Sequence, residues 1–200
     1  MSNALFFNSY KLKKGASVPD FLSAVDRLIN EYASKQKGFK SFKLLLDGDT
    51  WADYGIFETM EDAKSFENPT STNETAAQFY TFLNFNTCKS NIFTVERNAE
   101  VRSAAPAAAA FVSFKLKAGA SVQDFLLASD KVDSCPLSDE LISRKLLVKG
   151  DLWADLLFWE TMEGVKKAAE SENLSPAIKE YLSFIGEVTV HQHFTVEKSY

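Results

Sequence analysis

The sequence has few of the residues that mark a disulfide framework, a metal centre or a membrane span. Only two of its 200 residues are cysteine and two are histidine. Cys88 and Cys135 form no CxxC pair, and two unrelated thiols are typical of a reduced, cytoplasmic protein. No apolar run approaches the roughly 20 residues of a membrane-spanning helix, and no basic segment followed by an apolar run marks a signal peptide. The sequence therefore predicts a cytoplasmic protein without a membrane partner.

The sequence also lacks an excess of positive charge. Its net charge is -5 and its pI is about 5.2, whereas binding to nucleic acid phosphates needs a basic face. It contains no P-loop, GxGxxG, GxSxG or HExxH motif, which removes support for nucleotide binding, serine hydrolysis and zincin chemistry. We therefore expect no nucleic acid partner and no metal site of a familiar kind.

What the sequence does contain is the same unit written twice. Four stretches of the first half return in the second half, 101 to 104 residues later and in the same order. Copies of about 90 residues are domain-sized and are too long for solenoid repeats, which typically have about 20–50 residues. The matching stretches are 9–18 (SYKLKKGASV) with 113–122 (SFKLKAGASV), 49–53 (DTWAD) with 151–155 (DLWAD), 57–61 (FETME) with 159–163 (WETME), and 93–96 with 194–197 (both FTVE).

Each copy predicts the element order βαββαβ, a ferredoxin-like unit. In the first copy, alternation predicts strands over 5–12, 39–46, 50–57 and 90–97. Three- and four-residue spacing of apolar residues predicts a helix from Val18 that Gly38 ends. A second helix begins after Thr59, is interrupted at 68–70 because proline cannot continue a helix, and resumes toward Phe82.

The second copy repeats this order. Strands are expected over 110–116, 141–148, 152–159 and 188–197, with helices that begin at Ser121 and Thr161. The predicted organisation is a first repeat over 1–98, an alanine-rich linker over 99–109 and a second repeat over 110–200. Such a fused pair would pack as an internal pseudo-dimer, so we expect a compact monomer whose site lies between the halves.

The stretches Asp155-x-x-x-Trp159-Glu160-Thr161-Met162-Glu163 and, more loosely, 53–61 carry a resemblance to a known family. Together with the element order, they make the chain similar to the dimeric α/β-barrel superfamily, and within it to the antibiotic-biosynthesis-monooxygenase-like group. The resemblance implies an α+β fold in which two tandem ferredoxin-like repeats form a pseudo-dimeric α/β barrel, with helices outside and a cavity on the inner face of each sheet. Members of this superfamily include cofactor-independent oxygenases, haem-degrading oxygenases, lactone isomerases and proteins with no known activity, and the fold alone does not indicate which of these functions the chain has.

No cofactor is expected. Haem-binding members of the superfamily hold iron through a histidine on a helix, whereas His191 and His193 lie on a predicted strand. The Asn/Trp/Arg constellation of the cofactor-independent oxygenases does not map onto this sequence residue by residue.

The pocket candidates follow from strand alternation. Trp51 and Asp53 share one face of their strand, and Trp153, Asp155 and Trp159 share the corresponding face in the second copy. An acid between aromatic neighbours in both copies predicts a wall of the cavity, with the aspartates as polar anchors or proton carriers. The alternative is structural: each aspartate bonds to the backbone or to a cross-strand Lys43 or Lys145.

The histidines are asymmetric between the copies. His191 and His193 align with Ser90 and Ile92, lie two residues apart and therefore share a face. A site that specialised after duplication would show such asymmetry, and imidazole titrates near neutral pH. We expect the apolar face of Phe194 to pack on the helices, which turns the histidines toward the cavity and makes His193, His191 and Asp155 the catalytic candidates. A solvated pair and a His-x-His metal site are the alternatives, and no third metal ligand lies nearby in the sequence.

Two functions compete. The first is a small-molecule-binding barrel for an aromatic or apolar metabolite, because tryptophans on an inner face are typical of a ligand pocket; whether it also has a cofactor-independent monooxygenase-like activity is left open by the sequence. The second is a non-catalytic structural or partner-binding protein whose interior is filled by its own side chains.

Overall fold

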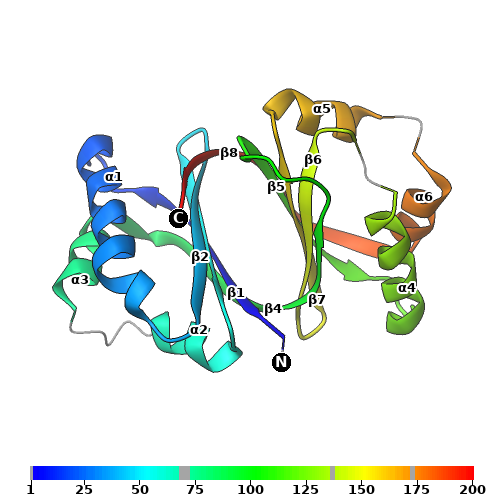
Figure 1. The fold of residues 1–200 in the computed structure, drawn as a ribbon, viewed down its shortest axis with the longest axis horizontal. Coiled ribbons are helices and arrows are strands. Elements are labelled where there is room, and N and C mark those ends of the chain that lie inside the picture. Colours follow the sequence, from blue (N-terminus) through cyan, green and yellow to red (C-terminus); the bar gives the residue numbers. More distant parts are fainter. Residues whose placement is uncertain (1, 68–72, 136–137, 172–173) are drawn as a thin grey trace. The chain divides into compact units, whose positions relative to one another are not determined.

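The chain folds into two compact units. The structure, a computed structural model, describes residues 2–67, 73–135, 138–171 and 174–200. Unit 1 consists of Met1–Thr94 together with Glu197–Tyr200, and unit 2 consists of Val95–Val196. Each unit contains one βαββαβ repeat, as the duplicated sequence predicted (Figure 1).

Unit 1 is an antiparallel sheet with helices on one face (Figure 1). Its strands are hydrogen-bonded in the order β4-β1-β3-β2, the order of a ferredoxin-like unit. The elements are β1 (Ala4–Leu12), α1 (Val18–Arg27), β2 (Phe39–Asp47), β3 (Thr50–Phe57), α2 (Met60–Phe66), α3 (Glu74–Thr81) and β4 (Leu83–Glu100). A π-helical turn over Leu28–Tyr32 and a 3-10 turn over Ala33–Lys35 continue α1 toward Gly38.

The local sequence explains where these elements begin and end. Ser17, Thr59 and Asn73 each place a side-chain oxygen on a backbone N–H of the first turn of α1, α2 and α3, which satisfies a donor that the helix itself leaves unpaired. Gly48 adopts a φ of 60° in the β2–β3 hairpin, a conformation that L side chains disfavour. The predicted helix interruption at 68–70 lies outside the described residues.

Unit 2 repeats the arrangement with the strand order β8-β5-β7-β6. Ser121 and Thr161 cap its helices as Ser17 and Thr59 do in unit 1. The elements are β5 (Ala108–Leu116), α4 (Val122–Asp133), β6 (Leu141–Lys149), β7 (Leu152–Trp159), α5 (Met162–Glu170), α6 (Pro176–Ser183) and β8 (Ile185–Ser199).

The last strand of each repeat is longer than predicted. β4 runs over Leu83–Glu100 and β8 over Ile185–Ser199, whereas alternation predicted 90–97 and 188–197. Residues just after these strands also have backbone partners: in unit 1 Tyr200 exchanges two backbone hydrogen bonds with Phe42, at 2.9 and 3.1 Å, and in unit 2 the N–H groups of Val101 and Arg102 donate to the carbonyl of Ile142. Backbone pairing therefore continues past the end of each of these strands.

The helices cover the sheet face that carries the tryptophans of the repeated WAD motif. Phe21 of α1 meets Trp51 of β3 edge-on with ring centroids 4.9 Å apart, and Phe125 of α4 meets Trp153 of β7 at the same distance. These aromatic contacts are the centre of each helix–sheet core. Within the described ranges, no helix is long and apolar enough to cross a membrane.

Candidate functional site

A row of three polar side chains crosses the sheet of unit 1 under its helices. Asn8 of β1 lies directly opposite Asp53 of β3 on one side and Ser90 of β4 on the other. Directly opposite residues of neighbouring strands have side chains on the same face, about 5 Å apart. The register of three strands therefore brings together residues that are far apart in the sequence.

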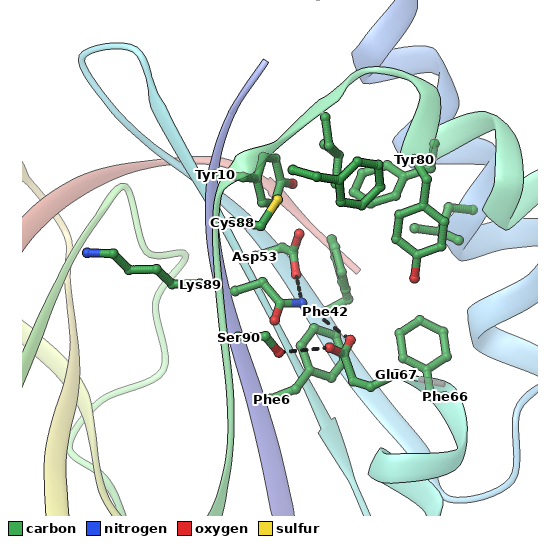
Figure 2. A pocket seen from close by; sticks show the side chains of 15 residues that line it. Phe6, Tyr10, Phe42, Asp53, Phe66, Glu67, Tyr80, Cys88, Lys89 and Ser90 are labelled. Carbon is green, nitrogen blue, oxygen red and sulfur yellow. Dashed lines mark hydrogen bonds between the residues drawn. The ribbon is translucent and has the colours of Figure 1, made fainter. Parts of the chain in front are cut away.

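Glu67 closes this row from the helix side. It is the last-turn cap of α2, and its Oε1 accepts a hydrogen bond from Asn8 Nδ2 at 3.3 Å while its Oε2 accepts one from Ser90 Oγ at 3.2 Å. The same Asn8 Nδ2 donates to Asp53 Oδ1 at 3.1 Å. One amide group thus bridges two carboxyl groups (Figure 2).

The bridged carboxyl pair lines an aromatic cavity of about 390 Å³ between the sheet and the helices of unit 1 (Figure 2). Asn8 Oδ1 is buried there without a hydrogen-bond partner among the described residues, and the Tyr10 hydroxyl is buried beside the Asp53 carboxyl group. Gly55 makes room for the Phe6 ring, because a Cβ at this position would lie 2.4 Å from that ring. The aromatic side chains of the lining are Phe6, Tyr10, Phe42, Phe66, Phe79, Tyr80 and Phe85.

Burial changes the acidity of both carboxyl groups. Asp53 is 3% exposed, and its burial, with the nearby charge of Glu67, raises its pKa to about 7. Burial also raises the pKa of Glu67. Ionising both groups at once is unfavourable because the charges are close and poorly solvated. Near neutral pH the Asp53 carboxyl group can therefore both release and accept a proton, which is what general acid–base catalysis needs.

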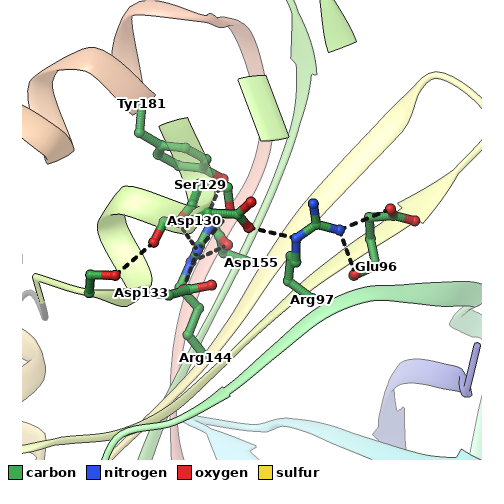
Figure 3. Close-up of polar contacts among 9 residues, drawn as sticks. Glu96, Arg97, Ser129, Asp130, Asp133, Arg144, Asp155 and Tyr181 are labelled. Carbon is green, nitrogen blue, oxygen red and sulfur yellow. Dashed lines mark hydrogen bonds and ion pairs between the residues drawn. The ribbon is translucent and has the colours of Figure 1, made fainter. Parts of the chain in front are cut away.

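The corresponding aspartate of unit 2 has a different environment. Asp155 Oδ1 accepts a hydrogen bond from Arg144 Nε at 2.9 Å, and Asp155 Oδ2 accepts one from the Tyr181 hydroxyl at 2.8 Å. Arg144 Nη1 also donates to Ser129 Oγ at 2.9 Å and to Asp133 Oδ1 at 2.7 Å (Figure 3). The Arg144 guanidinium therefore fixes Asp155 in a buried ion pair.

The two repeats have diverged at the positions that make the difference. Strand register and the repeat alignment place Val112 where unit 1 has Asn8, Arg144 where it has Phe42, and Ala169 where it has Glu67. At these positions unit 2 consequently has no amide to bridge and no carboxyl group equivalent to that of Glu67. It has a cavity of its own, of about 510 Å³.

The structure distributes the predicted pocket residues between core and cavity. Asp53 lines the cavity of unit 1, and Asp155, Trp159, His191 and His193 line the cavity of unit 2. Trp51 and Trp153 belong to the helix–sheet cores and line neither cavity. Whether any of these residues takes part in a reaction stays a prediction.

The predicted face of these strands was wrong. Trp51 and Trp153 contact α1 and α4, Trp159 clusters with Val165 of α5, and Asp155 bonds to Tyr181 of α6. These residues lie on the helix-covered face of each sheet, and not on the opposite, inner face. Alternation separates two faces but does not say which one the helices cover, because both faces of these strands carry apolar residues.

The same reversal applies to the histidines. His191 lies opposite Val112 and His193 opposite Ala110, and Val112 packs against the helix-side core of unit 2. The histidines therefore share the helix-covered face, and Phe194 points to the other one. Their Nε2 atoms are 3.0 Å apart, so they form a hydrogen-bonded pair. Among the described residues, no group of three or more His, Cys, Asp or Glu side chains is arranged to hold a metal ion.

The predicted lysine partners of the aspartates were also wrong. Lys145 forms an ion pair with Glu100 at 3.3 Å, and Lys43 donates to Ser199. Lys43 follows Phe42 and Lys145 follows Arg144 on their strands, so both lysines point to the sheet face opposite to that of the aspartates. The aspartates are instead bonded by Asn8 and Arg144.

Asn8, Glu67 and Tyr10 were missed as site residues. The criterion that singled out the histidines, divergence between the copies, could have found the first two, since they align with Val112 and Ala169. Tyr10 aligns with Phe114, and Tyr181 of unit 2 aligns with Phe79, so each repeat has a tyrosine near its aspartate but from a different element.

Comparison with known proteins identifies the fold. No family model matches the sequence, and no curated protein matches it. Among solved structures, a proposed monooxygenase from Fusobacterium nucleatum aligns with a TM-score of 0.72 at 11% identity, over 99% of this chain and 94% of that one. An anthrone oxidase-like protein aligns with a TM-score of 0.64 at 10% identity, over 100% and 93%.

A third structure, a ferredoxin-fold protein from Listeria monocytogenes related to antibiotic biosynthesis monooxygenases, aligns with a TM-score of 0.58 at 10% identity, over 98% and 95% of the two chains. These alignments span both repeats of this chain. The expectation is confirmed at the level of fold: the chain has an α+β fold of two tandem ferredoxin-like repeats, as in these solved structures.

Proposed function

We propose that the protein binds a small aromatic molecule in the cavity of unit 1 and oxygenates it without a cofactor, with the Asp53–Glu67 pair as the base. The observation that carries the proposal is the bridge from Asn8 Nδ2 to both carboxyl groups, at 3.1 and 3.3 Å, at the wall of an aromatic cavity. Structural neighbours that are named as monooxygenase-related or anthrone oxidase-like proteins support it.

The lining favours a flat ligand that carries a hydroxyl or carbonyl oxygen. Seven aromatic side chains supply apolar surface and ring edges, and aromatic pairs add about 0.5–1.5 kcal/mol beyond area burial. The free Asn8 Oδ1 can accept a hydrogen bond, so the hydroxyl group of a phenol or of the enol form of a ketone would satisfy it. Two carboxyl groups in the wall disfavour an anionic ligand.

The proposed reaction needs only molecular oxygen as oxidant. The ionised member of the carboxyl pair removes a proton from an activated methylene group of the substrate, and the resulting carbanion transfers electrons to O₂. One oxygen atom forms the new carbonyl group, and the other leaves as water with the two hydrogens of the methylene group, so that CH₂ and O₂ give C=O and H₂O. A base with a pKa of about 7 is suited to this task near neutral pH.

The proposed setting is a cytoplasmic monomer with neither nucleic acid nor a membrane as partner. Cys88 and Cys135 are exposed and unpaired, which supports a reducing compartment. Sedimentation of the full chain in a reducing buffer would test the monomer, since a dimer would double the measured mass.

The test uses the full chain and 1,8-dihydroxyanthrone in air-saturated buffer. Binding is followed by fluorescence, and turnover by oxygen consumption above the protein-free rate. We expect Asp53→Asn and Glu67→Gln to retain binding but to lower the rate about 100-fold or more, the usual contribution of a general base. Glu61→Gln, on the exposed side of α2, is the matched control and should keep the rate.

Binding without turnover above background would overturn the catalytic part of the proposal. Absence of binding to this compound and to related tricyclic phenols would overturn the ligand class and favour the non-catalytic alternative.

A further inference from the structure

We infer that unit 2 holds a second binding site, for a neutral aliphatic molecule that carries a carbonyl oxygen. The site is the cavity of about 510 Å³ between the sheet β5–β8 and helices α5 and α6. Its volume lies within the range of about 300–1,000 Å³ that is usual for small-molecule pockets. The inference does not depend on the function proposed for unit 1.

The lining of this cavity is aliphatic. Only Trp159 and Tyr181 contribute large aromatic rings, in contrast to the seven aromatic side chains around the cavity of unit 1. A flexible hydrocarbon chain can pack against aliphatic side chains, and unlike a flat ring system it needs no aromatic side chain to stack on. The aliphatic lining consists of Ala110, Val112, Val132, Leu157, Val165, Ala168, Ala169, Leu174, Ile178, Leu182, Ile185 and Val188.

Arg144 gives the cavity a buried hydrogen-bond donor. The residue is 2% exposed and lines the cavity. Its Nε and Nη1 bond to Asp155, Ser129 and Asp133, but its Nη2 is buried without an acceptor among the described residues. A buried donor without an acceptor destabilises the folded protein. A ligand oxygen in the cavity would supply that acceptor.

The charges around Arg144 favour a neutral oxygen over a carboxylate. One guanidinium faces two carboxylates, Asp155 and Asp133, at 2.9 and 2.7 Å, so this cluster sums to +1 - 2 = -1 before any ligand binds. An added carboxylate would meet that excess negative charge in a poorly solvated place. The neighbouring polar rings are Tyr181, bonded to Asp155, and the His191–His193 pair on β8. A ketone, aldehyde or ester oxygen avoids the repulsion.

The cavity of the first repeat has neither the arginine nor the aliphatic lining of this one. Phe42 stands in the place of Arg144, and Phe6 with Gly55 stands in the place of Ala110 with Leu157. In unit 1 the aromatic ring of Phe6 lies over Gly55, whereas in unit 2 the smaller Ala110 lies beside Leu157 in the cavity wall. The duplicated scaffold therefore carries two pockets of different chemistry.

The test is calorimetric titration of the full chain with 2-octanone, and in parallel with octanoate. We expect 2-octanone to bind and octanoate to bind at least about tenfold more weakly, because a buried like charge costs more than about 1.4 kcal/mol. Ala168→Phe fills the cavity from α5 and should weaken 2-octanone at least about tenfold. Ala77→Phe makes the same change on the exposed side of α3 and should leave the affinity unchanged.

Two further variants keep the test decisive if Ala168→Phe fails to fold. Ala169→Trp alters an exposed part of the lining and should also block 2-octanone. Arg144→Lys keeps the positive charge but loses the planar guanidinium group. It should weaken the binding of 2-octanone about fivefold or more. No heat of binding for 2-octanone, unchanged affinity in both cavity variants, or tighter binding of octanoate would each overturn the inference.

Discussion

Asp53 and Asp155 occupy the same position in the two copies of the strand, yet Asp53 is bonded by an amide and Asp155 by a guanidinium. Asn8 Nδ2 lies 3.1 Å from Asp53 Oδ1, and Arg144 Nε lies 2.9 Å from Asp155 Oδ1. The amide leaves its carboxyl group able to take up a proton near neutral pH, whereas the guanidinium compensates the charge of its partner. The same position thus carries a carboxyl group of raised pKa in unit 1 and an ion-paired carboxylate in unit 2.

The stability of the protein should fall as the pH rises from about 4 to about 8 because of Asp53. Its pKa is raised from 3.8 to about 7 in the folded state, so between these values the folded state binds more protons than the unfolded state, and the free energy of unfolding decreases with pH. A shift of this size corresponds to roughly 4 kcal/mol as an upper bound. The free energy of unfolding of wild type and of Asp53→Asn is measured with urea across this pH range. The advantage of wild type over the variant should shrink or reverse toward high pH, and a difference that does not change with pH would contradict the prediction.

Arg144→Phe, which copies the residue of the first repeat, should be strongly destabilising. It leaves Asp155 without its cation in a buried place, where Asp155 is 8% exposed, and breaking a buried pair costs about 3–5 kcal/mol. Adding Asp155→Asn should recover part of the loss, because it removes the uncompensated charge. The measurement is denaturant unfolding of the single and double variants, and a loss below about 1 kcal/mol in the single variant would contradict the ion-pair role.

Deleting residues 197–200 should loosen unit 1, although these residues are at the far end of the chain. Tyr200 exchanges backbone hydrogen bonds with Phe42, and Lys198 Nζ forms an ion pair with Asp26 at 2.6 Å. We expect a loss of about 1–3 kcal/mol and faster hydrogen exchange at the Phe42 amide. Lys198→Ala alone should cost under about 1 kcal/mol, since the ion pair is partly exposed.

Residues 1–100 expressed alone lack this C-terminal segment. We therefore expect that fragment not to be a well-behaved folded monomer. A sharp, cooperative unfolding transition of the isolated fragment would show that β2 does not need the backbone hydrogen bonds of Tyr200.

Trp159→Ala should cost about 3–5 kcal/mol. Trp159 is 3% exposed, packs with Leu157 and Val165, and donates from Nε1 to Ser138 Oγ at 3.1 Å. Trp159→Phe keeps most of the apolar contact and should lose markedly less. Thermal and urea unfolding separate these outcomes, and a cost below about 1 kcal/mol for the alanine variant would mean that the ring is not part of the core.

His193→Ile, which copies Ile92, should preserve stability within about 1 kcal/mol. The position tolerates isoleucine in the first repeat, and the variant removes the 3.0 Å contact between the two imidazoles. If the pair contributes to ligand binding in unit 2, titrations at about pH 5.5 and 8 should show weaker binding in the variant than in wild type. Equal affinity at both pH values would leave the pair without a role in binding.

The sequence by itself determined the duplicated βαββαβ architecture. The recurrence of residues 9–18 as 113–122 and of 49–53 as 151–155 needs no structure to be seen, and alternation, helix caps and turn residues are local signals. These signals also located Asp53 and Asp155 and the asymmetric histidines.

Only the tertiary structure decided which face of each strand lies under the helices. Both faces of β3 and β7 carry buried residues, so alternation was symmetric, and the contacts of Phe21 and Phe125 with the tryptophans chose one of them. The structure also brought Glu67 onto Asn8, 59 residues apart in the sequence. Strand register and helix packing make such contacts, and neither is encoded in a local pattern.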